Sequence, residues 1–427
     1  MEKTVSPVVN EAGRPPTGDL GREALGANSS WHVRATSVPE CVDKLAQIWS
    51  SAAVEAEHSA LTEIERQRAL ADPRLGGHLD QARSVRVRMR TSVLTLVVIA
   101  PRPETSERAM AAINALHRRH PSRAIVLSPG DFDGPASMDA HIYAECRIAE
   151  RSDAEVCTEQ ILVKVGGELS QHLSRVVAPL LIHDLPVVLW WPDDPTFGTR
   201  QFREIAGLAD RLLVDTGTFA EDGRHRLAGL AAVIAEGVVV CDIGWLRLNL
   251  WRELLAGLFD HPLLTREAEH IRSVRVDFAR PGAAIHLARA LYIGGWLAGQ
   301  LGWEIIQPIE RGEDDSFRGL LRRGRREIRL ELRPVRPPVD AASHAPGSLL
   351  GIDIEASRAR TALRARVTRQ RDHLLATADW NGAPVARRAG RLEQFDEAPF
   401  IAEALEQPGL DRLFERSLVR AARLRGG

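Results

Sequence analysis

The sequence predicts an α/β domain, with a mostly parallel βαβ sheet covered by helices, followed by an α+β domain with helices and an antiparallel sheet. Residues 93–100, VLTLVVIA, are almost uniformly apolar, as is typical of strands covered on both faces of a parallel sheet. Such runs alternate with amphipathic segments as far as Cys241, and this alternation predicts right-handed βαβ units. After Gly302, apolar residues alternate with polar ones, which indicates an antiparallel sheet with one solvated face.

We expect a disordered tail over residues 1–30, an α/β domain of Rossmann-like character with an N-terminal helical extension over residues 31–243, and an α+β domain over residues 244–427. The tail is rich in glycine, proline and charge and lacks the apolar core of a secretory signal. The strands expected in the first domain are 31–37, 93–100, 123–127, 138–148, 156–165, 185–190, 211–214 and 238–241. The helices expected between them begin at Pro39 or cover residues 103–120, 166–177, 199–209 and 223–235. Residues 61–87 are interpreted as helix and connection.

The second domain is expected to begin with helices and to continue with strands. Helices are predicted over residues 245–259, 262–271 and 283–301, with a strand at 274–278. The later strands are predicted at 303–309, 317–321, 327–335, 349–355, 361–368 and 373–380, and two helices, 398–406 and 409–424, close the chain.

Composition excludes several classes of protein. The chain has 427 residues, 44% of them apolar, and a formal net charge of −1. A chain of this length predicts about two or three domains with a sizeable core. Because acidic and basic residues balance, no chain-wide positive field favours nucleic acid or a membrane as partner. The most apolar runs reach less than half the length of a bilayer span, so we expect a cytoplasmic protein.

The four cysteines, Cys41, Cys146, Cys157 and Cys241, show no CxxC motif and no zinc-like spacing, so no metal is expected. Cys146 and Cys157 fall on strands predicted to be antiparallel neighbours. They could pair under oxidation, but a cytoplasmic location favours a reduced, buried pair.

Motifs for catalysis are missing from the sequence. It contains no GxGxxG after a strand and no GxxxxGK[ST], GxSxG or HExxH, so neither a cofactor nor a catalytic residue is assigned. Asp193 and Asp194 follow a predicted strand, where a carboxylate pair could hold a cation or act as a base. A turn before the next helix is the more ordinary role for an Asp-Asp-Pro segment.

Tryptophan is the unusual residue of this chain, with nine against two tyrosines. Trp190 and Trp191 are adjacent at a strand end, where neighbouring side chains point to opposite faces. Trp245 and Trp251 stand close to Arg247 and Arg252. Tryptophan and arginine dominate the hot spots of protein interfaces. From this enrichment we predict partner contacts at Trp190, Trp191, Trp245, Arg247, Trp251 and Arg252; the alternative is that they join the two domains.

Several sequence blocks, in order, resemble one family. They are HPSRAIVL from His120, CTEQI from Cys157, PLLIHDLPVVLWWPDDP from Pro179, DRLLVDT from Asp210 and DIGWLRLNLWRELLAGLFD from Asp242. Together they resemble the glucose-6-phosphate dehydrogenase assembly protein family, OpcA. The resemblance is strong over residues 90–262, extends less strongly to the C-terminus and is weak before residue 90.

The resemblance implies a non-catalytic protein that binds glucose-6-phosphate dehydrogenase, promotes its active oligomer and raises its activity in the oxidative pentose phosphate pathway. It supplies no catalytic residue to transfer and leaves the oligomeric state open. The competing interpretation is a sugar-phosphate enzyme, such as a lactonase or an isomerase, with an anion held by Arg123 or Arg200. A third is a sugar-phosphate sensor without a protein partner.

Overall fold

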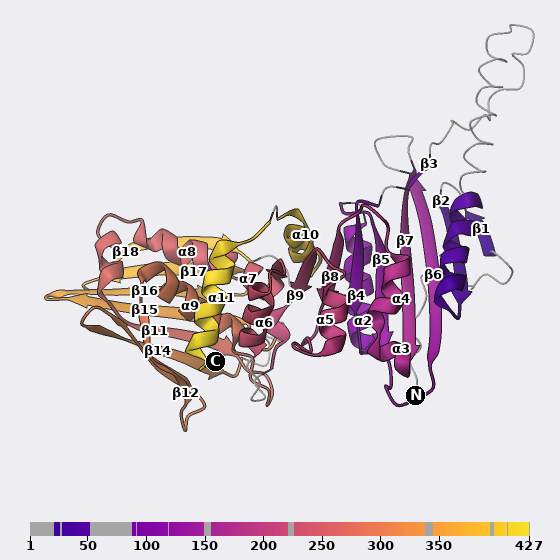
Figure 1. Cartoon of the computed structure of the whole chain (residues 1–427). Helices are drawn as coiled ribbons and strands as arrows, with labels where there is room; N and C mark the ends of the chain where they lie inside the picture. Colours follow the sequence, from indigo (N-terminus) through magenta and orange to yellow (C-terminus); the bar gives the residue numbers. More distant parts are fainter. Residues whose placement is uncertain are drawn as a thin grey trace, which may run out of the picture. The chain divides into compact units, whose positions relative to one another are not determined.

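The computed structural model describes residues 21–25, 28–51, 88–90, 92–117, 119–148, 155–220, 226–337, 345–392, 397–407 and 409–426. The described residues form two compact units (Figure 1). The first contains the chain up to Trp190 together with Arg200–Asp210; the second contains Trp191–Thr199 and the chain from Arg211 onward. The domain boundary expected between residues 243 and 244 stays a prediction. Most of the expected tail, and residues 52–87, lie outside the described residues, whereas Gly21–Leu25 and residues 28–30 form strands.

The first unit is built on a mixed sheet with the strand order β1-β2-β6-β7-β5-β4-β8, in which β3 pairs with β7. The pairs β7–β5, β5–β4 and β4–β8 are parallel, whereas β1, β2 and β6 run antiparallel to their neighbours. The strands are β1 (Gly21–Leu25), β2 (Asn28–Ala35), β3 (Arg88–Arg90), β4 (Leu94–Ile99), β5 (Ser122–Pro129), β6 (Ser137–Ile148), β7 (Glu155–Gly166) and β8 (Val187–Trp191). The predicted parallel core is confirmed.

Helices cover both faces of this parallel core. They are residues 38–51, α2 (Pro103–Leu116), α3 (Glu168–Gln171), α4 (Leu173–Val177), the 3-10 turn η1 (Ala178–Leu180) and α5 (Arg200–Ala206). Both α2 and α4 pack on β5. The connection from β4 through α2 to β5 and the connection from β7 through α4 to β8 run in opposite directions along the sheet. Because such connections are right-handed, α2 and α4 lie on opposite faces of the sheet. Every residue of β4, which lies between β5 and β8, is therefore buried. The single helix expected over 166–177 is broken at His172, whose ψ of 55° leaves the helical region.

The expected pairing of β6 with β7 is confirmed, and it sets the environment of Cys157. Strand register places residue 146 opposite Cys157. Opposed Cα atoms on antiparallel strands are about 4.5–5.5 Å apart, a separation that a disulfide spans. Cys157 is buried and disulfide-bonded, so the expectation of a reduced thiol is wrong for this residue. Cys41 and Cys241 are buried and free.

The second unit contains a parallel strand pair and a larger sheet. Strands β9 (Arg211–Val214) and β10 (Val240–Asp242) pair in parallel, with η2 (Thr216–Thr218) and α6 (Arg226–Ala235) between them in the chain. The larger sheet has the order β12-β13-β14-β11-β15-β16-β17-β18 and is antiparallel except between β11 and β14. Its strands are β11 (Ile271–Ala279), β12 (Glu304–Arg311), β13 (Phe317–Arg323), β14 (Arg326–Val335), β15 (Leu349–Arg358), β16 (Thr361–Arg369), β17 (His373–Trp380) and β18 (Ala383–Arg391).

The helices of the second unit are α7 (Ile243–Leu246), α8 (Asn249–Phe259), the 3-10 helix η3 (Thr265–His270), α9 (Ala288–Leu301), α10 (Ala398–Glu406) and α11 (Arg412–Leu424). Helix α9 packs on β11, β14 and α11. The approach of α11 to α9 is close: a Cβ at Gly295 would lie 2.6 Å from the Ser417 carbonyl oxygen, so this crossing requires glycine. Two predictions are corrected here. The α-helix expected over 262–271 is the shorter η3, and strand β18 was not predicted.

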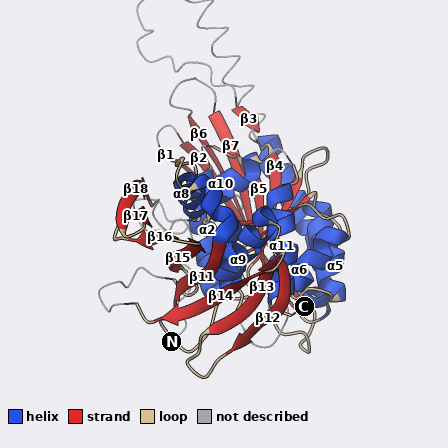
Figure 2. Cartoon of the chain, turned by 90° about the vertical axis from the view of Figure 1, so that its left-hand side faces the viewer, coloured by secondary structure: helices blue, strands red, loops and turns tan. Residues whose placement is uncertain are grey.

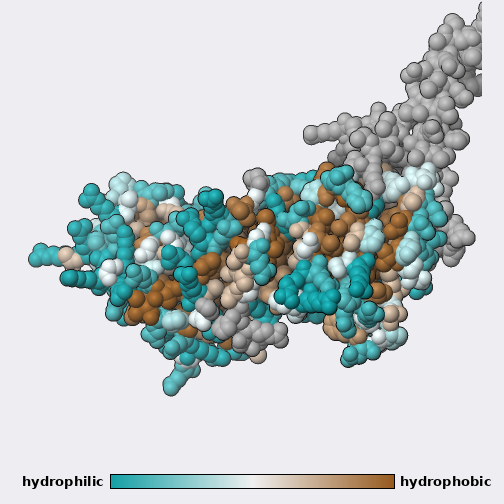
Figure 3. Space-filling view, viewed as in Figure 1, coloured by the Kyte–Doolittle hydropathy of each residue, from teal (hydrophilic) through white to brown (hydrophobic). Residues whose placement is uncertain are grey.

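The solvent face of the larger sheet carries a row of alternating charges. Strand register aligns Arg318, Glu331, Arg275, Asp353 and Arg366 across β13, β14, β11, β15 and β16. Glu331 accepts from Arg275 at 2.9 Å and from Arg318 at 3.2 Å, and Asp353 accepts from Arg366 at 2.9 Å. The prediction that one face of this sheet is exposed to solvent is therefore confirmed. Figure 2 shows the sheet with its neighbouring helices. In Figure 3, hydrophilic side chains gather at the hairpin ends of this sheet, on the left.

Candidate functional site

Two carboxylates stand at the ends of the parallel strands of the second unit. Asp215 directly follows β9, and Asp242 is the last residue of β10. Open α/β sheets bind their ligands at the carboxyl ends of parallel strands. Here Asp242 accepts hydrogen bonds from the Thr216 and Gly244 amides, at 3.0 and 2.8 Å, and from the Thr216 hydroxyl at 2.6 Å. The carboxylate of Asp242 is therefore occupied by its own chain.

Two arginines from distant parts of the chain lie beside Asp215. Arg289 of α9 places Nη2 3.6 Å from one carboxylate oxygen of Asp215, and Arg247, after α7, places Nε 3.8 Å from the other. The Gly217 amide donates to the same carboxylate at 2.8 Å. A Cβ on Gly217 would lie 2.0 Å from the Arg289 guanidinium, so the absence of a side chain there makes room for this cation. The strand ends are filled by protein groups, and we call this arrangement the sealed strand ends.

Burial shifts the acidity of two groups at the sealed strand ends. Desolvation, and then the negative charge of Asp215, raise the pKa of Asp242 to about 6. Desolvation also raises the pKa of Tyr292 well above its usual value, and the charge of Asp242 adds to that effect. Both side chains are buried, so little water is present to stabilise their charged forms.

Trp245, the central residue of the predicted contact set, is almost completely buried, with 1% of its surface exposed. Its indole N–H donates to Asp411 at 3.0 Å, and Asp411 caps α11 by accepting from the Leu413 and Phe414 amides. The Arg252 guanidinium lies 3.4 Å from the centre of a Trp245 ring. Trp245 also makes an edge-to-face contact with Tyr292. We call Trp245, Arg252, Tyr292, Asp411 and Phe414 the Trp245 cluster; it anchors the start of α11.

The other predicted contact residues divide into buried and partly exposed side chains. Trp190, Trp191 and Trp251 are each no more than 4% exposed. Arg247 stacks on Phe400 of α10 at 4.5 Å, and both Arg247 and Arg252 keep an intermediate exposure. Within the second unit the structure thus brings Trp245 and Arg252 together. The contact role of all six stays a prediction.

The residues considered for catalysis have structural partners. Asp194 forms an ion pair with Arg226. Among the described residues, no group of histidine, cysteine and carboxylate side chains has the geometry of a metal site. In the first unit, buried Arg123 donates to Glu159 at 2.5 Å and to the Leu180 carbonyl at 2.7 Å. Arg200 pairs with Glu204 at 2.6 Å. The anion role considered for Arg123 is thus taken by a carboxylate of the chain itself.

The turn between β4 and α2 lacks the features of a dinucleotide site. In such sites glycines let the backbone approach a pyrophosphate at the N-terminus of the helix. In this chain the turn is Ala100-Pro101-Arg102-Pro103, and Pro103, the first residue of α2, has no N–H to donate.

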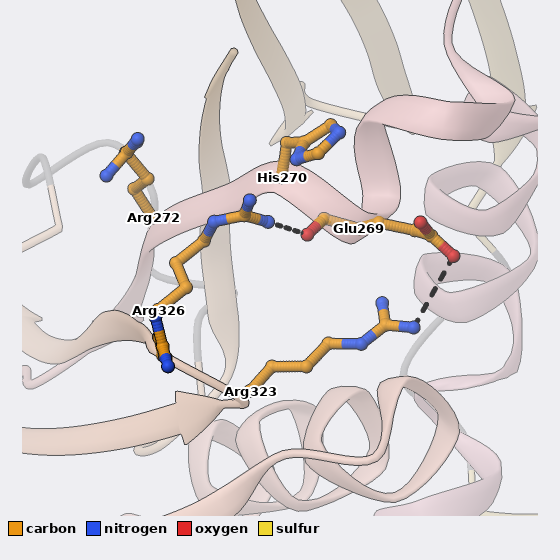
Figure 4. A pocket seen from close by; sticks show the side chains of 6 residues that line it. Glu269, His270, Arg272, Arg323 and Arg326 are labelled. Atoms are coloured by element: carbon orange, nitrogen blue, oxygen red, sulfur yellow. Dashed lines mark hydrogen bonds and ion pairs between the residues drawn. The ribbon is translucent and has the colours of Figure 1, made fainter.

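An arginine-rich pocket in the second unit was not predicted from the sequence. A cavity of about 440 Å³ is lined by Glu269, His270, Arg272, Arg323, Arg325 and Arg326 (Figure 4). These residues come from the end of η3, the start of β11 and the β13–β14 hairpin. The signal was present in the run Arg322-Arg323-Gly324-Arg325-Arg326, but sequence alone does not bring Arg272 to it.

Comparison with known families bears on identity. Residues 113–232 match the family described as glucose-6-phosphate dehydrogenase subunit N-terminal domain, and residues 238–418 match the corresponding C-terminal domain. The chain belongs to the OpcA family. The resemblance found in the sequence is therefore confirmed, and the family is assigned to assembly of glucose-6-phosphate dehydrogenase.

Similar proteins carry the same family name. A protein of Nostoc punctiforme named "Putative OxPP cycle protein OpcA" is 26% identical over 328 residues, covering 73% of this chain and 68% of that protein. A protein of the same name from Synechococcus elongatus is 26% identical over 204 residues, covering 47% of this chain and 44% of that protein. Among solved structures, myo-inositol 2-dehydrogenase from Lactobacillus plantarum aligns with a TM-score of 0.42 at 7% identity, covering 78% of this chain and 95% of that one. That score is too low to support a comparison of function.

Proposed function

We propose that this OpcA-family protein is a non-catalytic, cytoplasmic binding protein that associates with glucose-6-phosphate dehydrogenase, promotes its active oligomer and raises its activity. The matches to both domains of the assembly family support the partner. The names of the similar proteins support a place in the oxidative pentose phosphate cycle.

The observation that carries the non-catalytic part of the proposal is the sealed strand ends. The Arg289 guanidinium lies on Gly217, Asp242 accepts three hydrogen bonds from the chain, and Asp215 accepts one from the Gly217 amide and lies beside two arginines. A substrate at the ends of β9 and β10 would have to displace a buried arginine and leave a buried carboxylate unpaired, at a cost of several kcal/mol, about 3–5 for breaking a buried pair. This arrangement favours binding through the surface of the protein over chemistry at the strand ends.

An activator of this kind acts through differential binding. It must bind the active form of the dehydrogenase more tightly than the inactive form, because equal affinity for both shifts nothing. A difference of about 1–3 kcal/mol changes apparent substrate affinity roughly 5- to 150-fold. The expected effect is therefore large enough to appear in a simple saturation curve.

The contacts with the dehydrogenase are proposed at the tryptophan and arginine set predicted from the sequence. Arg247 and Arg252 offer the exposed surface within that set, whereas Trp190, Trp191, Trp245 and Trp251 support it from the interior. Removing a buried tryptophan would change folding and binding together. Arg252→Gln keeps all the tryptophans, and its denaturant unfolding curve shows whether the Trp245 cluster, on which Arg252 stacks, stays intact. Arg333→Gln is the matched loss of charge, because Arg333 pairs with Asp277 on the larger sheet.

The test is the glucose 6-phosphate saturation curve of the purified dehydrogenase with and without this protein. We expect the half-saturating concentration to fall when the protein is added, and size-exclusion chromatography to show the two proteins co-eluting. Arg252→Gln should weaken the activation, whereas Arg333→Gln should leave it unchanged. An unchanged curve with the wild-type protein, or turnover of 6-phosphogluconolactone by this protein alone, would contradict the proposal.

A further inference from the structure

We infer that the pocket lined by Glu269, His270, Arg272, Arg323, Arg325 and Arg326, which we call the arginine pocket, binds a phosphorylated small molecule. Its lining carries four guanidinium groups against one carboxylate. Among the described residues, Arg272, Arg325 and Arg326 form no ion pair. Their positive charge is therefore left over for a ligand, unlike the arginines of the charged sheet face.

The hairpin concentrates these arginines at an electrostatic cost. Register pairs Arg323 directly with Arg326 across the two-residue turn Gly324–Arg325, where Gly324 has a φ of 60°. Like charges directly opposite each other on antiparallel strands are destabilising. A bound anion would convert this repulsion into attraction, because each guanidinium could then donate to it.

Glu269 shows how an anionic group sits among these side chains. Its carboxylate lies 3.4 Å from Arg323, and its backbone carbonyl accepts from Arg326. Figure 4 shows both interactions, with the two arginines reaching Glu269 from the hairpin. The Glu269 side chain is 64% exposed in its ion pair with Arg323, so this contact is weak and a stronger anion can replace it.

The chemistry of the lining favours a phosphoryl group. Arginine presents a planar fork of donors that matches phosphate oxygens, and charge-assisted hydrogen bonds are stronger than neutral ones. His270 adds a polar ring to the lining of the pocket. The pocket is open to solvent, and its volume of about 440 Å³ gives room for a small molecule. A phosphorylated metabolite has both the negative charge and the small size that this pocket accommodates.

The same end of the sheet strengthens the field around the arginine pocket. The turn between β15 and β16 lies at this end, and it carries the exposed residues Arg358 and Arg360. Positive charges gathered on one surface raise the local concentration of anions and their rate of binding. The site is thus suited to a ligand with two or more negative charges.

The experiment is isothermal titration calorimetry of the full chain with glucose 6-phosphate and with inorganic pyrophosphate, using glucose as the uncharged control. We expect saturable binding of both anionic probes with a Kd below about 1 mM, weakened by added salt, and no binding of glucose. The double variant Arg323→Gln/Arg326→Gln should weaken binding at least about tenfold, since it removes charge-assisted hydrogen bonds. Arg333→Gln, which alters net charge on the same sheet, should stay within about twofold of wild type.

Two results would overturn the inference: no saturable binding of either probe, or equal affinity in the double variant and the wild type. Loss of dehydrogenase binding in the double variant, without probe binding to the wild type, would assign the surface to an acidic protein instead and would equally overturn it. Because the probes are titrated into this protein alone, the outcome is separate from that of the activation assay.

Discussion

The sealed strand ends and the arginine pocket both contain several charged groups, but the two sites treat them in opposite ways. At the strand ends, Arg289 and Arg247 meet Asp215, and Asp242 is saturated by three donors. In the pocket, one carboxylate faces four guanidinium groups at the surface. Charges buried within one chain must be compensated by that chain, whereas exposed charges can be left for a ligand. Residue type alone therefore does not separate structural charge from functional charge; burial and pairing do.

In the Trp245 cluster, as at the sealed strand ends, buried polar groups are paired within the chain. Removing its central side chain should have the largest effect on the free energy of unfolding. Trp245→Ala removes a buried aromatic ring, the hydrogen bond to Asp411 and the surface on which Arg252 stacks. We expect the free energy of unfolding to fall by about 3–5 kcal/mol. Denaturant unfolding followed by circular dichroism measures this change, with Trp245→Phe as the control that keeps most of the volume. A loss under about 1 kcal/mol would show that the cluster is not a structural anchor.

Measuring the free energy of unfolding as a function of pH tests the burial of Asp242. Its native pKa of about 6 exceeds the usual value of 3.8, so between these values the native state binds more protons than the unfolded state. Stability from this group is therefore complete below pH 4 and is lost as the pH rises through 6, by about 3 kcal/mol. Asp242→Asn cannot ionise and should lack this decline. Unfolding curves of both proteins between pH 4 and 7 give the difference; parallel pH dependences would mean that Asp242 is not buried as described.

The smallest effect is expected in the arginine pocket, and it has the opposite sign. Arg326→Gln removes one member of the like-charged pair with Arg323. We expect the variant to be as stable as wild type, or more stable by up to about 1 kcal/mol at low salt. The measurement is the thermal midpoint at low and high ionic strength, where screening should reduce the difference. Destabilisation at low salt would show that Arg326 is a structural residue after all.

Sequence patterns predicted the fold well where one physical rule dominates. Uniformly apolar runs located the parallel strands, and alternation located the strands of the larger sheet from β12 to β17. They failed where local signals conflict. Apart from Pro384, Ala383–Arg391 has only one apolar side chain larger than alanine, Val385, so it lacks the alternating pattern of the other strands. Thr265–His270 is too polar and short to complete an α-helix.

The candidate sites were harder to predict, because they depend on contacts between distant segments. The abundance of tryptophan and arginine near residue 245 indicated an interface, and the structure places Trp245 against its own C-terminal helix. Nothing in the residues around Asp242 shows that Arg289 lies beside Asp215. The arginine run at residues 322–326 is visible in the sequence, whereas its proximity to Glu269 and Arg272 requires the register of β11 beside β14.

The two border strands of the larger sheet, β12 and β18, have a consequence for behaviour at high concentration. Exposed borders invite strand addition from another molecule, and proline and charge at these positions oppose it. Strand β18 carries Pro384, Arg387 and Arg388, and β12 carries Pro308, with Glu304 at its start and Glu310 and Arg311 at its end. These residues oppose edge-to-edge association of the larger sheets of two molecules. Binding of a partner at another surface therefore does not have to compete with such self-association.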